Sequence, residues 1–327
     1  MIYFITPDLS SISGGNKYDI NVLKYLNKNY CKVINISPNK NTSNMLLFFL
    51  RINRIPYRST LIIDGLLAFN LSNIVDKLSK KYKVILLIHH PVSYEHQKNG
   101  KIEHKLKERK IFSKANEIIS VSNSMKNVIK KMLNSKKNIN VIKPAVDDIY
   151  HQQPLNNMDS KKIVTTGSII PRKNIDKCIE VLSKLEKDWS LSIIGKYDKN
   201  DTYYKKLISH INDNDLSQRV TFHNLIEDQD DLIDILKNSS VYICLSSYEG
   251  FGMANVESAS LGLPLVVSDL PVFRENLRGY NRRYVDINNP DLIANAVMEI
   301  SCVKDYKNIP VYNWRDVGLK FKRALYG

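Results

Sequence analysis

The chain has few of the residues that mark several classes of protein. Only 12 of its 327 residues are glycine and 11 are proline, which excludes a collagen-like or broadly disordered chain. Its four cysteines lie far apart and form no CxxC pair, so neither a zinc site nor a disulfide framework is expected. No run of about 18 apolar residues occurs, and the N-terminus lacks a signal-peptide pattern. We therefore expect a cytoplasmic protein with no membrane span.

Acidic residues are scarce in one half of the chain only. Residues 1–150 hold 25 Lys and Arg against 10 Asp and Glu, whereas residues 151–327 hold 23 of each kind. The formal net charge of +15 therefore belongs to the first half, which we expect to face an anionic partner. Nucleic acid, anionic lipid and a phosphorylated substrate are the candidates. A compositional bias of the genome is the alternative, although bias alone would charge both halves alike.

The chain does contain a regular alternation of strand and helix patterns. Continuous apolar runs such as 83–90 and 241–246 alternate with helical patterns such as 102–114 and 290–301. Apolar strands that alternate with helices indicate parallel sheets covered on both faces. The alternation breaks at 145–160, which is polar, contains a proline and lacks periodicity. The sequence therefore predicts an α/β fold of two tandem units that join near this stretch.

Two loops that follow strands in the first half are candidate sites, because doubly wound sheets bind ligands beyond the carboxyl ends of their strands. Gly14 and Gly15 follow the first strand and precede a helix, so backbone amides can approach a phosphate there. A tight turn without a ligand is the alternative. His89 and His90 follow an apolar strand and are suited to bind a substrate hydroxyl or to stabilise charge. Histidines that merely pack at a strand end are the alternative, and no further ligand is suitably spaced for a metal.

Two adjacent cations, Arg172 and Lys173, follow the predicted strand at 161–167 and precede a helix. Together with the helix N-terminus they make an anion site that suits a diphosphate. A solvated Arg-Lys turn is the alternative, because such turns are common at protein surfaces.

The densest pattern is SYEGFGMANVE, which follows a buried strand of the second half. Its glycines allow the amides of Phe251, Gly252 and Met253 to face phosphate oxygens at the start of a helix. Glu249 lies in the loop and Glu257 lies inside the helix, so one carboxylate can hold a ribose diol while the other meets a sugar. A Glu257 that is buried beside a lysine is the alternative.

Together these motifs resemble glycosyltransferase family 4, a retaining family of the GT-B fold. The specific part of the resemblance is EGFGMANVESASLGLPLVVSD at 249–269, and weaker matches lie at 13–15, 87–90, 167–174 and 311–325. The resemblance implies two Rossmann-like domains that face each other across a cleft. The implied parts are an acceptor-binding domain at 1–150, a donor-binding domain at 151–310 and a C-terminal helix at 311–327 that packs back on the first domain.

The resemblance also implies a site without a metal or a cofactor, whose donor substrate is a nucleotide diphosphate sugar linked to UDP or GDP. The residues implied to bind the donor's phosphates and ribose are Gly14, Gly15, Phe251, Gly252, Met253 and Glu257. The residues implied in the chemistry are His89, Glu249, Arg172 and Lys173, with His90 as the alternative to His89. In these roles the two cations neutralise the departing diphosphate, Glu249 contacts the transferred sugar and the histidine binds a sugar hydroxyl.

The basic first half suggests where the acceptor lies. Residues 44–58 join an apolar cluster to three arginines, and residues 98–114 contain six lysines and one arginine. We expect both segments to rest on anionic lipid at the inner face of a membrane. The expected acceptor is then a glycan, free or linked to polyprenyl diphosphate, in the synthesis of a cell-surface polysaccharide. An apolar core at 45–50 with solvated lysines is the alternative.

Two other functions fit parts of the sequence. A sugar-nucleotide epimerase of the same fold would use the donor site and need no acceptor. A nucleic-acid-binding protein would use the basic half, but the chain has neither basic strands interleaved with aromatic residues nor a helix-turn-helix. We therefore expect a retaining glycosyltransferase without a nucleic-acid partner.

Overall fold

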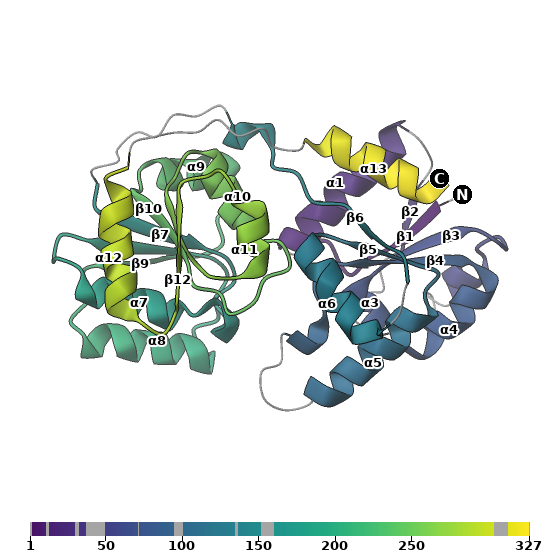
Figure 1. Ribbon diagram of the computed structural model, residues 1–327, viewed down its shortest axis with the longest axis horizontal. Helices are drawn as coiled ribbons and strands as arrows, with labels where there is room; N and C mark the ends of the chain where they lie inside the picture. The colour runs from purple at the N-terminus through teal and green to yellow at the C-terminus, as the bar shows by residue number, and fades with distance from the viewer. Residues whose placement is uncertain are drawn as a thin grey trace. The chain divides into compact units, whose positions relative to one another are not determined.

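Two compact units make up the structure, which is a computed structural model (Figure 1). The first unit holds Met1–Ala145 and Tyr312–Gly327, and the second holds Val146–Val311. The residues that the structure describes are 2–10, 13–29, 33–36, 50–70, 72–94, 101–134, 137–151, 160–303 and 313–326. Each unit has its own parallel sheet and its own apolar core, as the alternation of strands and helices predicts.

A six-stranded parallel sheet with the order β2-β1-β3-β4-β5-β6 forms the centre of the first unit. Its strands are β1 (Ile2–Ile5), β2 (Val33–Ile36), β3 (Thr60–Asp64), β4 (Lys83–Ile88), β5 (Glu117–Ser120) and β6 (Ile139–Val141). The chain adds β2 on one side of β1 and then continues on the other side with β3, so the strand order reverses between β1 and β3. Doubly wound sheets bind their ligands at such a reversal, beyond the carboxyl ends of the strands.

Helices pack on this sheet, and its inner strands are correspondingly apolar. The helical segments of the first unit are α1 (Gly14–Asn29), α3 (Gly65–Asn70), α4 (Ser72–Lys81), η1 (Val92–Tyr94), α5 (Lys101–Lys114), α6 (Asn123–Leu133) and α13 (Trp314–Tyr326). Leu61, Ile62 and Ile63 of β3 are fully buried in sequence, which is typical of a strand covered on both faces. Helix α6 begins where the Ser122 hydroxyl accepts a hydrogen bond from Met125 N–H.

The C-terminal helix α13 packs on α1 within the first unit, which confirms the predicted return of the chain to its first half (Figure 1). Gly318 permits the close crossing of the two helices, because a Cβ atom there would lie 1.8 Å from Tyr25 Cδ1. Tyr18 of α1 meets both Trp314 and Phe321 of α13, with ring centroids 6.0 Å apart in each pair. These aromatic contacts and the glycine together seat α13 on α1.

A second six-stranded parallel sheet, with the order β12-β11-β10-β7-β8-β9, forms the centre of the second unit. Its strands are β7 (Lys162–Thr166), β8 (Ser190–Ile194), β9 (Val220–His223), β10 (Val241–Cys244), β11 (Leu265–Ser268) and β12 (Arg282–Val285). The chain runs from β7 outward to β9 and then returns to β10 on the other side of β7. The strand order therefore reverses between β7 and β10, which makes the carboxyl ends of these two strands the expected binding edge.

Side chains on the two faces of this sheet belong to two apolar clusters. The helical segments of the unit are η2 (Asp148–Tyr150), η3 (Pro171–Lys173), α7 (Ile175–Lys184), α8 (Thr202–Asp213), α9 (Gln229–Lys237), α10 (Met253–Ser260), α11 (Pro271–Asn276) and α12 (Pro290–Ser301). One cluster holds Ile163 and Ile243 with residues of α7, α8 and α12. The other holds Val164 and Tyr242 with residues of η2, α9, α10 and α11. Neighbouring strand residues thus alternate between the two clusters.

The structure differs from the sequence prediction at several places. Helices α3, α4 and α11 and strand β12 lie where no element is predicted. The strand predicted at 83–90 ends at Ile88, so both histidines belong to the loop that follows β4. Of the predicted linker at 145–160, residues 152–159 lie outside the described residues, while Val146 and Tyr150 belong to the core of the second unit.

None of the helices in the described ranges combines the length and the apolar character that crossing a membrane requires.

Candidate functional site

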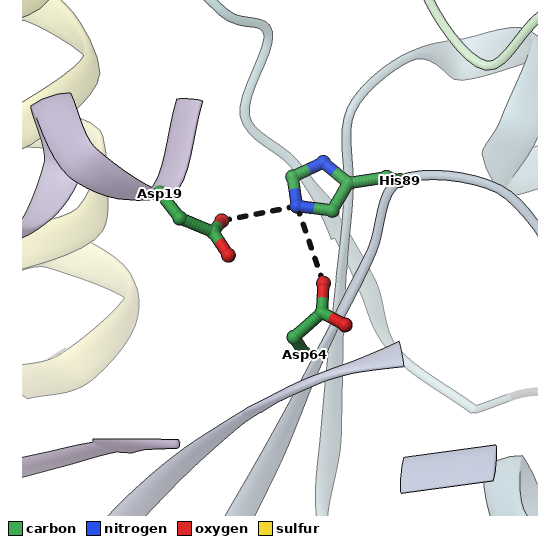
Figure 2. Close-up of side chains that lie close together, drawn as sticks. All are labelled: Asp19, Asp64 and His89. Atoms are coloured by element: carbon green, nitrogen blue, oxygen red, sulfur yellow. Dashed lines mark hydrogen bonds and ion pairs between the residues drawn. The ribbon is translucent and has the colours of Figure 1, made fainter. Parts of the chain in front are cut away.

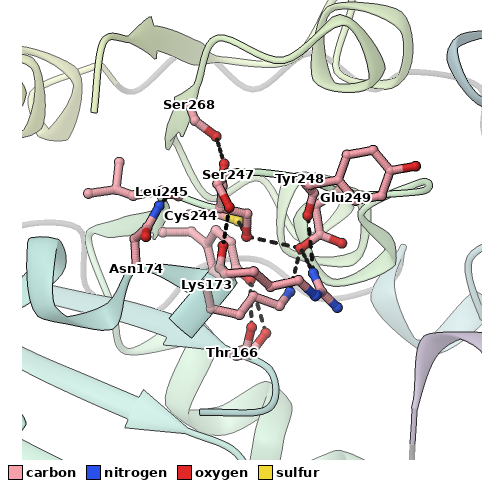
Figure 3. A network of polar contacts seen from close by, with 12 residues as sticks. Thr166, Lys173, Asn174, Cys244, Leu245, Ser247, Tyr248, Glu249 and Ser268 are labelled. Atoms are coloured by element: carbon pink, nitrogen blue, oxygen red, sulfur yellow. Dashed lines mark hydrogen bonds and ion pairs between the residues drawn. The ribbon is translucent and has the colours of Figure 1, made fainter. Parts of the chain in front are cut away.

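A cluster of one carboxylate and two cations lies at the reversal of strand order in the second unit (Figure 3). Glu249 Oε1 accepts hydrogen bonds from Lys173 Nζ at 2.6 Å and from Arg172 Nη1 at 3.1 Å. Ser246 Oγ donates to the same oxygen at 2.9 Å. The cations follow β7 and the carboxylate follows β10, so the parallel pairing of the two strands brings these residues together.

Backbone contacts fix the loop that carries the two cations. Asn174 adopts the left-handed conformation, with φ of 50°, between η3 and α7, and its Nδ2 donates to Leu245 O at 2.7 Å. Arg172 O accepts a hydrogen bond from Ser247 N–H at 2.8 Å. Gly167 has a φ of 131°, and a Cβ atom there would lie 3.2 Å from Lys173 Nζ. The loop after β7 is therefore tied to the loop after β10, and the lysine lies against a backbone without a side chain.

The electrostatics of the cluster keep its carboxylate ionised. Burial by itself raises the pKa of Glu249, but the charges of Lys173 and Arg172 and the hydrogen bonds from Lys173 and Ser246 lower it to about 2. At neutral pH the cluster thus combines two positive charges with one negative charge. The resulting net charge of about +1 is positive and therefore attracts a phosphate.

The N-terminus of α10 lies in the same loop region and is built around Gly252. This residue has a φ of 83°, and a Cβ atom there would lie 2.8 Å from Phe273 Cε1. Asn276 Nδ2 donates to Phe251 O at 3.0 Å, so α11 holds this loop through a hydrogen bond. The first hydrogen bond of the helix is the one from Asn255 N–H to Gly252 O. The amides that precede Asn255 cannot be paired inside the helix, which makes this end suited to an anion.

Glu257 lies on α10, one turn beyond Met253, and its side chain is partly buried. The spacing of four residues places it on the face of the helix that includes Met253. The structure thus keeps the two acidic residues of this segment in different settings. Glu249 is engaged by cations in the loop, whereas Glu257 belongs to the helix.

A second cluster, of one imidazole and two carboxylates, lies at the reversal of strand order in the first unit (Figure 2). His89 Nε2 lies 3.0 Å from Asp19 Oδ1 and 3.4 Å from Asp64 Oδ2. Asp64 ends β3, His89 follows β4 and Asp19 lies on α1. Side-chain exposure is only 1% for Asp19 and 5% for Asp64, so both carboxylates are buried beside the ring.

Gly14 and Gly15, which are predicted to precede a helix, are instead the first residues of α1, and the structure brings them beside the predicted histidine. A Cβ atom at Gly15 would lie 3.3 Å from His89 Cδ2, so the first turn of α1 packs against the ring. Tyr18 packs edge-on to the same ring with centroids 5.3 Å apart. His90 has other surroundings: it lies near Glu108 of α5, a buried carboxylate that accepts Ser93 N–H at 3.3 Å. Of the two histidines, His89 is the one beside the glycines at the start of α1.

Asp19 and Asp64 are site residues that the sequence analysis does not predict. The signal for Asp64 is its position as the last residue of a strand at the reversal of strand order. Among the described residues, Asp19, Asp64 and His89 are the group whose donor atoms approach within 4.8 Å of one another. The direct contact between His89 Nε2 and Asp19 Oδ1 has the geometry of hydrogen-bonded partners, with a proton in the position that a cation would need.

The predicted site residues thus fall into two groups, one in each unit. Gly14, Gly15 and His89 lie in the first unit. The other group lies in the second unit and consists of Arg172, Lys173, Glu249, Phe251, Gly252, Met253 and Glu257. Each group lies at the reversal of strand order of its own sheet, in the loops that follow the strands and in the helices that begin there.

Residues 146–310 match the family model described as Glycosyl transferases group 1. A related protein from Xanthomonas oryzae, GDP-mannose:cellobiosyl-diphosphopolyprenol alpha-mannosyltransferase, is 31% identical over 134 residues. The match covers 36% of the present chain and 34% of that protein, so the chain aligns with only about a third of the relative's length.

Similarity to solved structures extends over nearly the whole chain. Sucrose-phosphate synthase of Thermosynechococcus elongatus is similar with a TM-score of 0.82 at 14% identity, and the match covers 99% of the present chain and 98% of that one. HepE of Anabaena in complex with UDP and glucose is similar with a TM-score of 0.72 at 14% identity, with 98% of each chain covered. At these identities the likeness is one of fold, and it confirms the predicted pair of Rossmann-like domains of the GT-B type.

Proposed function

Because the chain belongs to the group 1 glycosyl transferases, we propose that it is a retaining glycosyltransferase. Its donor is a nucleotide diphosphate sugar, and its acceptor is a glycan, free or linked to a polyprenyl diphosphate, in the synthesis of a cell-surface polysaccharide. The Arg172–Glu249–Lys173 cluster is the observation that carries this proposal. Its net positive charge and the adjacent N-terminus of α10 form a site with the charge and the backbone donors that a diphosphate needs.

The proposed reaction exchanges one bond at the anomeric carbon for another. The bond from that carbon to the diphosphate oxygen breaks while the acceptor hydroxyl oxygen bonds to the same face, and the acceptor proton passes to the departing phosphate oxygen. Negative charge grows on the diphosphate, and Arg172, Lys173 and the amides of Phe251, Gly252 and Met253 stabilise it. Glu257 binds the ribose and Glu249 contacts the transferred sugar. In the first unit, Gly14 and Gly15 bind phosphate and His89 binds a sugar hydroxyl.

The printed names of similar proteins support the two substrates. The Xanthomonas relative is named for GDP-mannose as donor and for a diphosphopolyprenol-linked acceptor. HepE binds UDP and glucose in its solved complex. These names support a donor linked to UDP or GDP and a lipid-linked glycan acceptor for the present chain.

Nucleotide binding tests the donor site directly. The melting temperature of the purified chain is measured against UDP, GDP, ADP, CMP and dTDP without added metal, because a ligand that binds the folded state raises it by mass action. We expect one of the diphosphates to raise the melting temperature selectively. Glu257→Ala removes the proposed ribose contact and reduces the shift, whereas Glu299→Ala, at an exposed ion pair of α12, leaves it unchanged.

A product assay then separates transfer from the other reactions of a sugar nucleotide. The matching nucleotide sugar is incubated with and without a glycan acceptor, and the anomeric proton of the product is followed by NMR. An α-linked product from an α-linked donor, formed only with acceptor, supports retaining transfer. Conversion of the donor alone into an epimeric sugar identifies an epimerase, and the absence of any nucleotide shift contradicts the donor site itself.

We further infer that the first unit docks on an anionic membrane through a patch on α3 and α5. Leu66, Ile102 and Leu106 are 48%, 77% and 59% exposed. Helices α3 and α5 pack together through Phe69 and His104, whose rings are 5.1 Å apart. The exposed cations that border the apolar side chains are Lys105, Arg109 and Lys110. Apolar side chains bordered by cations favour the interface of an anionic bilayer.

The other predicted membrane segment, 44–58, is described only in part. Residues 44–49 lie outside the described residues. Ile52 and Ile55 are buried, so the apolar side chains of this stretch belong in part to the core. Leu50 and Tyr57 are exposed.

Vesicle sedimentation tests the membrane surface. We expect the chain to sediment with vesicles of phosphatidylcholine and phosphatidylglycerol but not with phosphatidylcholine alone. The double variant Ile102→Ser with Leu106→Ser loses this binding, whereas Leu292→Ser, a change at an equally exposed leucine of the second unit, retains it. Binding that does not depend on anionic lipid, or that survives the double variant, contradicts the inference.

A further inference from the structure

The His89 ring has its two nitrogens in different surroundings. Both nearby carboxylates approach Nε2, and Figure 2 shows the second ring nitrogen, Nδ1, on the side of the ring that is turned away from them. An ionised carboxylate oxygen only accepts hydrogen bonds, so the proton of this contact is assigned to Nε2. Nδ1 is then the ring nitrogen that can form a hydrogen bond with a ligand.

Both carboxylates are held in place by the fold. Asp64 Oδ1 accepts the N–H groups of Leu66 at 2.9 Å and Leu67 at 3.2 Å at the start of α3, which leaves Oδ2 for the ring. Gly65 lets this turn pack on β4, because a Cβ atom there would lie 2.8 Å from Ile88 Cδ1. Asp19 is fixed on α1, and its second oxygen, Oδ2, is buried with no hydrogen-bond partner. The charge of Asp19 is therefore compensated chiefly through the ring of His89.

The charge balance of the cluster favours a protonated ring. Two buried carboxylates beside a neutral imidazole would leave two uncompensated negative charges, whereas an imidazolium leaves one. Burial by itself lowers the pKa of His89, but the charge and hydrogen bond of Asp19 and the charge of Asp64 raise it overall. Burial and the charge of Asp19 raise the pKa of Asp64 to about 6, against the opposing effects of His89 and the α3 amides. The two carboxylates together thus favour the protonated ring.

The remaining titratable groups near the ring do not replace these partners. Tyr18 of α1 meets the ring edge-on, and burial together with Asp19 raises its pKa well above its ordinary value. Its hydroxyl donates to Ile142 O at 2.8 Å, so it remains a neutral donor directed away from the imidazole. His90 in the adjacent loop lies near Glu108. The carboxylates that face His89 are thus Asp19 from α1 and Asp64 from β3.

We propose that Asp64 and Asp19 are positioning residues that hold the Nε2 proton of His89, keep the ring an imidazolium and present Nδ1–H as a hydrogen-bond donor to a hydroxyl oxygen of the bound sugar. The last part of this statement rests on the proposed function, whereas the protonation of the ring does not. With both carboxylates ionised the cluster carries a net charge of about −1. This negative charge stabilises the positive charge that develops on a sugar ring during glycosyl transfer.

NMR of the chain without added donor or acceptor tests the protonation directly. The imidazole signals of 15N-labelled protein are followed against pH, and the His89 signal is assigned by its loss in His89→Gln. We expect the His89 pKa to fall by about one unit in Asp64→Asn, which keeps an oxygen for the α3 amides but removes the charge. Asp19→Asn, at the shorter contact, gives a fall at least as large. The charge-matched control is Asp76→Asn, at an ion pair of α4 in the same unit, which leaves the titration unchanged.

Two results overturn the proposal. One is a His89 titration in both cluster variants that matches the Asp76→Asn control. The other is a neutral wild-type ring at pH 7 with its proton on Nδ1. The backbone amide spectrum of each variant, compared with that of the wild type, shows whether the variant remains folded.

The kinetic arm separates a positioning role from a structural one. In Asp64→Asn the alkaline limb of the kcat profile moves to lower pH by the shift that NMR measures, and kcat above that limb falls about tenfold for each unit. A merely structural effect lowers kcat at every pH without moving the limb, which overturns the positioning role. The NMR arm needs neither donor nor acceptor. The two proposals therefore fail separately: a shifted titration with no nucleotide binding contradicts the proposed function alone.

Discussion

Lys173 Nζ and Glu249 Oε1 meet at 2.6 Å although 76 residues separate them in the chain. The contact joins the loop after β7 to the loop after β10 at the reversal of strand order. Arg172 binds the same oxygen, so a single carboxylate orients both cations in the unliganded protein. Charges oriented in advance need little reorganisation when negative charge develops on a leaving group, which is the condition under which they lower a barrier most.

Lys173→Met should therefore act on turnover more than on donor binding. The variant keeps the aliphatic stem and the Arg172 contact but removes the ammonium nearest the carboxylate. We expect kcat to fall by about a hundredfold, with a smaller change in the KM for the donor. Steady-state kinetics with the donor identified by nucleotide binding measure both constants. The control is Lys184→Met, an exposed lysine of α7 whose ion pair with Asp291 is 3.8 Å long, and an equal loss there would contradict the assignment.

The pH dependence of stability should report on Glu249. Its pKa in the folded chain is about 2, below the ordinary value of 4.5, because Lys173 and Arg172 outweigh the effect of burial. A lowered pKa means that the fold stabilises the ionised form, so this stability is present above pH 4.5 and is lost as the pH falls toward 2. The difference in pKa corresponds to about 3 kcal/mol at most.

Urea unfolding of the wild type and of Glu249→Gln over this pH range measures the effect. The wild type should lose stability relative to the variant as the pH falls, because only the wild type has this carboxylate to protonate. Parallel stability curves for the two proteins would show that Glu249 is not held ionised by the cations.

The architecture, and the location of most candidate site residues just after strands, could be predicted from local sequence, because both depend on short-range patterns. Buried parallel strands are continuous apolar runs, and the proposed phosphate-binding segments lie between such a run and a helix. The placement of His89 beside Gly15 follows from the same rule, since both follow strands of one sheet. The missed strand β12 shows the limit of the rule: its sequence, RRYV, is partly exposed at a sheet edge and contains no apolar run.

The partners of the site residues could not be predicted in this way. Asp19 and His89 are 70 residues apart, and neither belongs to a local motif with the other. The position of Asp64 depends on the pairing of two strands. It ends β3 beside Leu87 of β4 and therefore lies close to His89, two residues after Leu87. The engagement of both Arg172 and Lys173 by one oxygen of Glu249 is likewise a result of strand pairing rather than of spacing.

Gly252→Ala should damage the start of α10 specifically. The residue has a φ of 83°, a backbone conformation that residues with a side chain rarely adopt. The new Cβ atom would also lie 2.8 Å from Phe273 Cε1. We expect a loss of about 1–3 kcal/mol in the free energy of unfolding together with weaker nucleotide binding. Adding Phe273→Leu in the same chain relieves the contact but not the backbone strain. The double variant should therefore be less destabilised than the sum of the two single variants, yet still less stable than the wild type. A fully additive pair would show that the two residues do not meet.

Gly318→Ala tests whether the C-terminal helix stabilises the first unit and its histidine cluster. A Cβ atom at this position would lie 1.8 Å from Tyr25 Cδ1, so α13 has to move away from α1 or displace the tyrosine ring. Either response loosens the contacts of Tyr18 with Trp314 and Phe321, and Tyr18 also packs on His89. We expect a loss of about 1–3 kcal/mol in the free energy of unfolding, and a perturbed His89 imidazole signal.

Removing the obstructing ring is the matched control for this change. Tyr25→Ala with Gly318→Ala should be less destabilised than the sum of the two single variants, because the new methyl group then meets no aromatic ring. Urea unfolding of all four proteins gives the coupling energy, and the imidazole NMR signal shows whether the His89 cluster recovers with it. If Gly318→Ala unfolds like the wild type and leaves the His89 signal in place, α13 is not seated on α1 by this glycine. A stability loss with an unchanged His89 signal has a different meaning, because it confines the role of α13 to the fold and separates it from the site.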